Sequence, residues 1–187
     1  MLRFDDPLPS RPRRVVVAGV SGAGKSTLAR AIAASIDARY TELDALFHGP
    51  DWTPRPEFVD EMTALAQSDA WVTEWLYDSA RPVLAARADL LVWLDLPFLT
   101  VILPRVVRRT IRRSVRREEL WNGNVEPPLC TFFTDREHIV KWAWSTRHLN
   151  RTRVPEAAES NPCLTVVRLR SQRQADAWLA GPLAAST

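Results

Sequence analysis

The chain has 187 residues, 46% of them hydrophobic, and a formal net charge of +3, which fits one folded domain and excludes a disordered tail or a fibrous repeat. The longest apolar run, residues 90–103, is interrupted by Asp95 and Pro97 and is shorter than the roughly 20 residues of a membrane helix, so no membrane partner is expected. Cys130 and Cys163 form no disulfide or zinc pattern, and acids and prolines fill the N-terminal segment, so we expect a cytoplasmic protein.

Hydrophobic patterning predicts strands that alternate with helices. Residues 14–19 (RVVVAG) are a β-branched apolar run typical of a strand buried on both faces, and residues 26–36 carry an apolar side chain at every fourth position, as in a helix. The other predicted strands are 39–43, 71–76, 90–96 and 165–169, and the other predicted helices are 57–67, 81–88 and 172–179, the last of them stopped by Gly181 and Pro182. This alternation predicts an α/β fold, a parallel sheet with helices on both faces.

The predicted domain organisation is simple. Residues 1–13 are expected to be a flexible N-terminal arm, because they are rich in charges and prolines, and residues 14–187 are expected to be a single domain. Within that domain, the loop over residues 49–56 holds one glycine and three prolines, so it is expected to lack regular structure.

A phosphate-binding loop is predicted between the first strand and the first helix. Residues 19–27 read GVSGAGKST and satisfy GxxxxGK[ST] directly after a buried strand. The glycines let backbone N–H groups surround phosphate oxygens, and the helix N-terminus adds further donors. Lys25, one of only two lysines, would contact the β- and γ-phosphates, and Ser26 would bind Mg²⁺. The cofactors predicted are ATP and Mg²⁺, and the nucleotide-binding residues in this loop are Gly19, Ser21, Gly22, Ala23, Gly24, Lys25, Ser26 and Thr27.

Together with five further stretches, this loop resembles the small P-loop kinases of the adenylate, shikimate and gluconate kinase type. The stretches are ELDALFHGPDWTPRPEF, VWLDLP, an arginine-rich helix, ELWNGN and VVRLRS, and the resemblance spans roughly residues 13–179. In appearance the chain is most similar to bacterial adenylate-kinase-related ATPases labelled DNA topology modulation proteins. The resemblance implies a three-layer P-loop NTPase fold with a mobile arginine-bearing lid at about residues 105–124, and a loop around Arg170 that packs on the adenine.

Arginines gather from residue 105 to residue 117, on one face of a predicted helix and opposite Val107, Ile111 and Val115. The resemblance implies that Arg105 and Arg109 are catalytic and close over the transferring phosphoryl group, whose oxygens suit planar bidentate donors. The alternatives are a solvated helix face or a nucleic-acid patch.

Polar residues after the second predicted strand point to an acceptor pocket. Ligands of doubly wound folds bind beyond the carboxyl ends of the strands, so Asp44 is predicted to face the acceptor. In relatives that phosphorylate hydroxyl groups, an aspartate here orients or deprotonates the alcohol, and the alternative is a turn or helix-capping role. His48, Trp52 and Arg55 on the following loop offer rings and a cation to a bound base or phosphate.

Two more charged residues take their predicted roles from the resemblance. Glu74 ends the third predicted strand, where relatives hold magnesium-bound water, and Arg81 matches an arginine that binds the acceptor phosphate in nucleotide kinases. Relatives typically have Asp-Gly at this strand end, whereas this chain has Glu74 followed by Trp75. We therefore expect a bulky side chain in the space of the usual substrate contacts.

The sequence as a whole predicts Mg-ATP-dependent phosphoryl transfer to a small-molecule acceptor: a nucleoside, a nucleotide or a related metabolite. The alternative is a nucleotide-binding regulatory ATPase whose arginine lid signals to a DNA or protein partner. Asp44 favours the kinase, and the missing glycine after Glu74 favours the regulatory ATPase. Nucleic acid is therefore the less favoured partner, but the sequence alone leaves it open.

Overall fold

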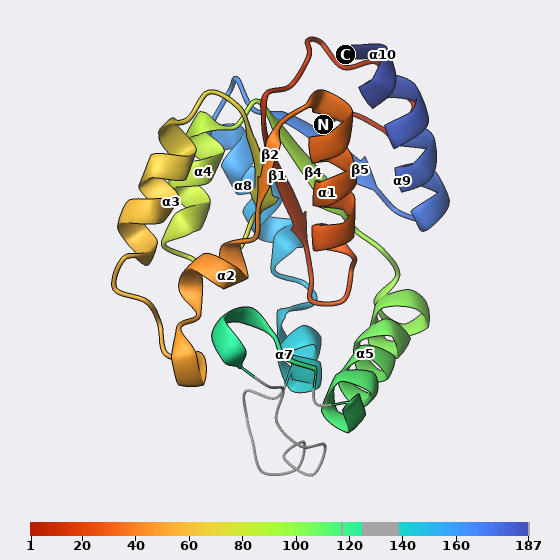
Figure 1. The fold of residues 1–187 in the computed structure, drawn as a ribbon. Coiled ribbons are helices and arrows are strands. Elements are labelled where there is room, and N and C mark those ends of the chain that lie inside the picture. Colours follow the sequence, from red (N-terminus) through yellow and green to blue (C-terminus); the bar gives the residue numbers. More distant parts are fainter. Residues whose placement is uncertain (117, 125–138, 187) are drawn as a thin grey trace.

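The computed structural model describes residues 1–116, 118–124 and 139–186, and the centre of this described part is a parallel sheet (Figure 1). Its strands lie in the spatial order β2 (Arg39–Thr41), β3 (Trp71–Glu74), β1 (Arg14–Gly19), β4 (Leu90–Leu94) and β5 (Thr165–Leu169). Every neighbouring pair is parallel. The predicted α/β class is confirmed, and each strand begins at the residue that the sequence pattern predicted.

Helices cover both faces of the sheet and give the molecule three layers. One face carries α1 (Lys25–Ile36) and α9 (Gln172–Trp178), and the other carries α3 (Phe58–Gln67), α4 (Ala80–Arg87) and α8 (Asn150–Ser160). Side chains of β1 alternate between the two layers because successive residues of a strand point to opposite faces.

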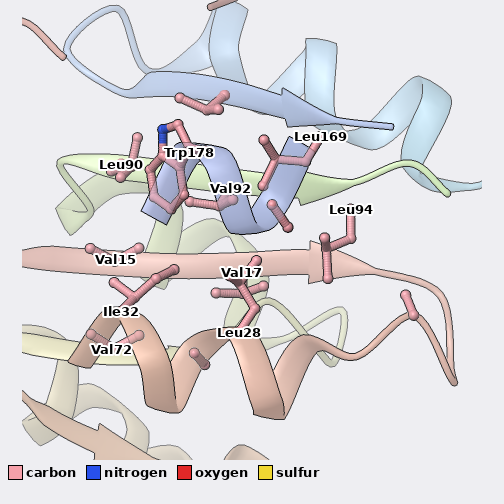
Figure 2. Close-up of a cluster of buried hydrophobic side chains, with 14 of the residues drawn as sticks. Val15, Val17, Leu28, Ile32, Val72, Leu90, Val92, Leu94, Leu169 and Trp178 are labelled. Atoms are coloured by element: carbon pink, nitrogen blue, oxygen red, sulfur yellow. The ribbon is translucent and has the colours of Figure 1, made fainter. Parts of the chain in front are cut away.

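Figure 2 shows the cluster between α1 and the sheet, where Leu28 and Ile32 pack on Val15 and Val17 of β1. Val15 and Val17 are completely buried, as is Val16 on the opposite face. Burial of a valine side chain stabilises a fold by about 1.5–3 kcal/mol, so this strand is a firm support for the loop that follows it.

The first residues of the chain lie against the sheet, in contrast to the expected flexible arm. The backbone of Leu2 pairs with β5: its N–H donates to the carbonyl of Val166 at 2.7 Å, and its carbonyl accepts from the N–H of Arg168 at 3.1 Å. Leu2, Phe4 and Leu8 also pack on the hydrophobic core. The apolar residues dispersed among the charges and prolines explain this difference, because burying them keeps them from water.

The C-terminal helix continues past the predicted stop, so that prediction was wrong. After α9 the chain makes a π-helical turn, Leu179–Leu183, and a last helical turn, α10 (Ala184–Ser186). Leu183 is fully buried in the core, which holds the chain on its helical path. The wider π turn takes up the disruption that Pro182 causes.

The arginine-rich segment forms α5 (Leu103–Arg116), which follows a π-helical turn at Phe98–Ile102. Its packing face consists of Val106 and Thr110, both buried. The apolar residues opposite the arginines are not on that face, since Val107, Ile111 and Val115 are 38%, 46% and 72% exposed.

Three short elements and one further helix complete the site end of the molecule. They are α2 (Leu43–Phe47), the 3-10 turns Pro50–Trp52 and Trp121–Gly123, and α7 (Ile139–Thr146). The loop that was expected to be irregular thus contains a single 3-10 turn, closed by a bridge between His48 and Pro54. Among the described residues, no helix is both long and apolar enough to cross a bilayer.

Candidate active site

The phosphate loop connects β1 to α1 at the lower end of the sheet in Figure 1, at the same end as α2 and α5. Gly22 and Gly24 have φ of +81° and +97°, a backbone conformation that glycine adopts without steric cost. Gly24 is also the N-cap of α1, so Lys25, Ser26 and Thr27 form the first turn of that helix, with their N–H groups free of intrahelical partners. The predicted placement of the loop between strand and helix is confirmed.

Helix α5, with which the predicted lid begins, packs on the phosphate loop. A Cβ on Gly22 would collide with Cγ2 of Val106, which is fully buried against the loop. One turn further along α5, Nη2 of Arg109 donates to Oγ of Ser21 at 3.3 Å. The first half of α5 is therefore fixed to the phosphate loop, and glycine is needed at position 22 for space as well as for its backbone conformation.

Lys25 is the electrostatic centre of the site. It is partly buried, and its Nζ donates to the carbonyl of Val20 at 3.3 Å. Burial lowers the pKa of Lys25, the carboxylates of Asp44 and Glu74 oppose this shift, and the guanidinium groups of Arg109 and Arg81 add to it. The four side chains that shift the pKa of Lys25 were thus predicted for the metal, lid and acceptor sites, and Lys25 was predicted to bind phosphate.

Glu74 is a buried carboxylate at the carboxyl end of β3, only 2% exposed. Its Oε1 accepts from the hydroxyl of Tyr40 at 2.5 Å and its Oε2 accepts from the backbone N–H of Leu43 at 3.2 Å. Burial and the bond to Glu74 raise the pKa of Tyr40. The Tyr40 phenol therefore holds one oxygen of the carboxylate that was predicted to hold Mg²⁺ through water.

Asp44 lies in the first turn of α2, and its carboxylate is held by a residue that sequence reasoning missed. The hydroxyl of Tyr77 donates to Oδ1 of Asp44 at 2.6 Å and lies 3.2 Å from Nε2 of His48. The ring of Tyr77 stacks on Phe47 with 4.0 Å between centroids. Tyr77 is 33 residues from Asp44 in the chain, and no local motif marks it.

The predicted acceptor residues His48 and Trp52 lie beside Asp44 in a group of aromatic rings. His48 stacks on Trp121 with centroids 5.9 Å apart, and the Trp52 ring meets His48 edge-on at 5.2 Å. The structure thus brings an aromatic surface and a carboxylate together at the end of the sheet, next to the phosphate loop.

The ELWNGN stretch, to which the sequence assigned no chemistry, contacts the loop over residues 48–56. Because His48, Trp52 and Arg55 of this loop were predicted to bind the acceptor, it is called the acceptor loop below. Asn124 is buried, its Nδ2 donates to the carbonyl of Gly49 at 2.8 Å, and its Oδ1 accepts from the N–H of Trp52 at 2.9 Å. Asn122 donates to the carbonyl of His48. The second part of the predicted lid region therefore contacts the loop of His48 and Trp52, whereas α5 packs on the phosphate loop.

Replacing Asn124 by alanine should loosen the acceptor loop. The substitution leaves the Gly49 carbonyl and the Trp52 N–H without this partner, a loss of about 1–3 kcal/mol for buried polar groups. We expect the Michaelis constant for the acceptor to rise by about tenfold while that for ATP stays constant. Steady-state kinetics measure this. The matched control is Asn161→Ala, which removes a side-chain bond to the Ala157 carbonyl at the end of α8. An equal rise for ATP would contradict the assignment.

The remaining predicted arginines have partners outside an acceptor pocket. Arg55 makes a two-pronged ion pair with Glu61, with Nη2 to Oε1 at 2.8 Å, and donates to the Leu46 carbonyl. Arg81 pairs with Asp78 and is largely buried, and its Nε has no hydrogen-bond partner among the described residues. Arg55 therefore stabilises the acceptor loop. The Nε–H group of Arg81 is left as a hydrogen-bond donor near Lys25.

Arg105 and Arg170 lie at the side of the site next to β5. Nη2 of Arg105 is 3.5 Å from Oε1 of Gln172, and the backbone N–H of Arg170 donates to Oε1 of Gln174 at 2.7 Å. Both arginine side chains are exposed. Of the two arginines predicted to close over the phosphoryl group, the structure brings Arg109 to the phosphate loop and places Arg105 at the loop after β5.

Trp75 does not enter the substrate space, so that expectation was wrong. Its ring is 4% exposed and packs in the core cluster beneath α4, and its Nε1 donates to the carbonyl of Arg81 at 3.0 Å. Because Glu74 faces the site, the alternation of an extended chain turns Trp75 into the core. The bulky residue that stands in place of the relatives' glycine is therefore part of the core.

Comparisons with known proteins identify the fold. No protein-family model and no curated protein matches the chain. Among solved structures, a gluconokinase from Sinorhizobium meliloti 1021 is 23% identical, covers 91% of this chain and 93% of its own, and has a TM-score of 0.51. A shikimate kinase from Acinetobacter baumannii in complex with shikimate is 17% identical, covers 95% of this chain and 91% of its own, and also has a TM-score of 0.51. The chain therefore has the three-layer α/β P-loop fold of these kinases.

Proposed function

We propose that this protein is an ATP-dependent kinase that transfers a phosphoryl group to a hydroxyl of a small metabolite. The observation that carries the proposal is the Asp44 carboxylate, which Tyr77 holds at the end of the sheet and which acts electrostatically on Lys25 of the phosphate loop. A carboxylate facing a phosphate-binding lysine is the pair of groups that an alcohol acceptor needs.

The residues present fit Mg-ATP. The loop offers positive-φ glycines and the N-terminus of α1, both suited to phosphate oxygens, and the Ser26 hydroxyl and the Glu74 carboxylate are oxygen donors suited to Mg²⁺. When bound, Mg²⁺ would neutralise charge on the β- and γ-phosphates. Ser26 would bind the ion directly, and Glu74, whose oxygens already accept hydrogen bonds, would hold it through water.

The chain's own groups divide the transfer step between them. Asp44 accepts the proton of the acceptor hydroxyl as that oxygen bonds to the γ-phosphorus, and the bond from the γ-phosphorus to the bridging oxygen breaks to release ADP. Lys25 and Arg109 stabilise the negative charge on the transferring group, since both act at the phosphate loop. The aromatic rings around His48 exclude water, which would otherwise compete with the acceptor.

The neighbours' names suggest which acceptors to test first. One neighbour is a gluconokinase, and the other was solved with shikimate. Nucleosides and nucleotides are the further classes suggested by the motif resemblance, within which the likeness to adenylate-kinase-related ATPases stays a prediction. The aromatic surface of Trp52, His48 and Trp121 suits the face of a sugar ring or a base.

Acceptor-stimulated ADP release tests the proposal. The panel consists of D-gluconate, shikimate, adenosine and AMP, each with Mg-ATP, and ATP alone gives the baseline. We expect at least one alcohol to raise ADP release well above the baseline and to appear as a phosphate ester by mass spectrometry. A flat panel over these and related alcohols, with ATP bound, would contradict the kinase assignment.

The exposed arginines of α5 favour a second candidate, a regulatory ATPase with a DNA partner. Arg108, Arg112 and Arg116 are exposed on one side of the helix, although Arg112 is paired with Glu118. Such a surface binds duplex DNA through counterion release, so its affinity falls steeply with salt. We expect only weak binding at physiological salt, and tight binding that is lost on neutralising Arg112 and Arg116 would favour this candidate.

A further inference from the structure

We propose that Tyr77 is a positioning residue that aims the Asp44 carboxylate at the acceptor hydroxyl, an inference that rests on the proposed kinase function. Its hydroxyl donates to Oδ1 of Asp44 at 2.6 Å. Within the described residues, no other hydrogen bond reaches the Asp44 side chain, so Oδ2 is available for the acceptor. With one oxygen held by a phenol, the other is free to accept a proton from the acceptor, as a general base does.

Tyr77 is itself held firmly. Its φ of +56° is uncommon for a bulky residue, and its carbonyl accepts hydrogen bonds from the N–H groups of Ala80 and Arg81 at 3.2 and 3.0 Å. Its ring stacks on Phe47 and meets Phe58 edge-on at 5.3 Å between centroids. The backbone at the start of α4 thus fixes the position of Tyr77, and two aromatic rings pack on its side chain.

The hydrogen bonds of His48 and Tyr77 are directed toward Asp44. A phenol has one proton, and Tyr77 donates it to Asp44, so the contact of 3.2 Å with His48 requires Nε2 of His48 to be the donor. Burial and the negative charge of Asp44 raise the pKa of Tyr77, which keeps the phenol protonated. His48, Tyr77 and Asp44 therefore form a chain of donors that ends on the carboxylate and leaves it an acceptor.

Fluorine NMR tests the contact without nucleotide or acceptor. The chain contains two tyrosines, Tyr40 and Tyr77, so protein labelled with 3-fluorotyrosine gives two signals, assigned with Tyr40→Phe and Tyr77→Phe. We expect Asp44→Asn to shift the Tyr77 signal and to leave the Tyr40 signal in place, because Tyr40 donates to Glu74. An unshifted Tyr77 signal would show that the bond is not formed in solution and would overturn the proposal.

A double-mutant cycle tests the role in catalysis, with adenosine and D-gluconate as the probe acceptors. Tyr77→Phe should lower kcat by about 10–100-fold and leave the Michaelis constant for ATP unchanged, because one hydrogen bond to a charged group is lost. If Tyr77 acts through Asp44, the same change made in the Asp44→Asn protein should alter kcat less than about twofold. Equal losses in both backgrounds would show that Tyr77 acts independently and would contradict the proposal.

Phe47→Leu is the matched control, since it removes the stacked ring and keeps the Tyr77 hydroxyl. It should lower the melting temperature but reduce kcat much less than Tyr77→Phe, whose melting temperature should stay close to that of the unsubstituted protein. Larger catalytic loss in Phe47→Leu would assign Tyr77 a packing role only. If neither probe acceptor is phosphorylated by the unsubstituted protein, the kinase proposal fails, and the fluorine signals still decide whether Tyr77 holds Asp44.

Discussion

Replacing Lys25 by alanine should lower ATP turnover by at least about 10²–10³-fold, the loss typical of removing one preorganised donor at a transition-state charge. The structure makes this loss severe because burial and the nearby arginines already lower the pKa of Lys25, which means that the charge is poorly solvated and is held for an anionic partner. Turnover is measured as ADP release, and ATP affinity is measured separately by calorimetry. We expect both to weaken.

The chain supplies its own control for this experiment. Lys141 is the other lysine of the sequence and lies in α7, outside the phosphate loop. Lys141→Ala should leave turnover unchanged, so the comparison separates the loss of a lysine from the loss of this lysine. Unchanged turnover in Lys25→Ala would remove the basis of the nucleotide assignment.

The sheet was predictable from the sequence because each strand is marked by its own consecutive residues. The run RVVVAG marks β1 to the residue, β4 is a similarly continuous apolar run, and β5 (TVVRL) is a short run of β-formers. Strands buried on both faces of a parallel sheet read this way, and their short length and β-branched residues distinguish them from buried helices. The phosphate loop was predictable for the same reason: its motif, its preceding strand and its following helix are adjacent in the chain.

The packing face of α5 was not predictable from periodicity. The sequence shows a cationic side and an apolar side, yet the helix packs through Val106 and Thr110, which lie between the two. The deciding contact is with Gly22, where Val106 occupies the space that a side chain would need. A helix that packs on a loop buries the side chains that fit the shape of that loop. The hydrophobic pattern of the helix does not show that shape.

Half of the candidate acceptor site was not predictable either. Asp44 and His48 follow a predicted strand and could be placed, whereas Tyr77 and Asn124 contact this loop from 33 and 75 residues away in the chain. Their side chains make ordinary hydrogen bonds that leave no pattern in a single sequence. The expectation for Trp75 failed for a different reason. It rested on one local difference from the relatives, a tryptophan in place of glycine, whereas the ring is buried in the core.

The second large effect is expected from Asp44→Asn. The amide keeps the shape and still accepts from the Tyr77 hydroxyl, but it no longer takes a proton, so kcat for an alcohol acceptor should fall by about 10²–10⁴-fold. ATP affinity should stay nearly intact, because Asp44 acts on Lys25 only through space. Single-turnover kinetics with the best acceptor of the panel measure the loss, and Asp60→Asn, an exposed carboxylate of α3, is the matched control.

Arg109→Lys separates the chemistry of the acceptor from that of the phosphoryl group. Arg109 contacts Ser21 of the phosphate loop, and an ammonium cannot reproduce the planar fork of a guanidinium on phosphoryl oxygens. Transfer should slow for every acceptor, by up to about 10²–10³-fold, whereas the exposed Arg108→Lys on the same helix should not change it. If Asp44→Asn raises only the acceptor's Michaelis constant while Arg109→Lys slows transfer, Asp44 binds substrate without taking its proton, and an acceptor that is already ionised becomes the better assignment. Full activity in both variants would place the chemistry elsewhere in the molecule.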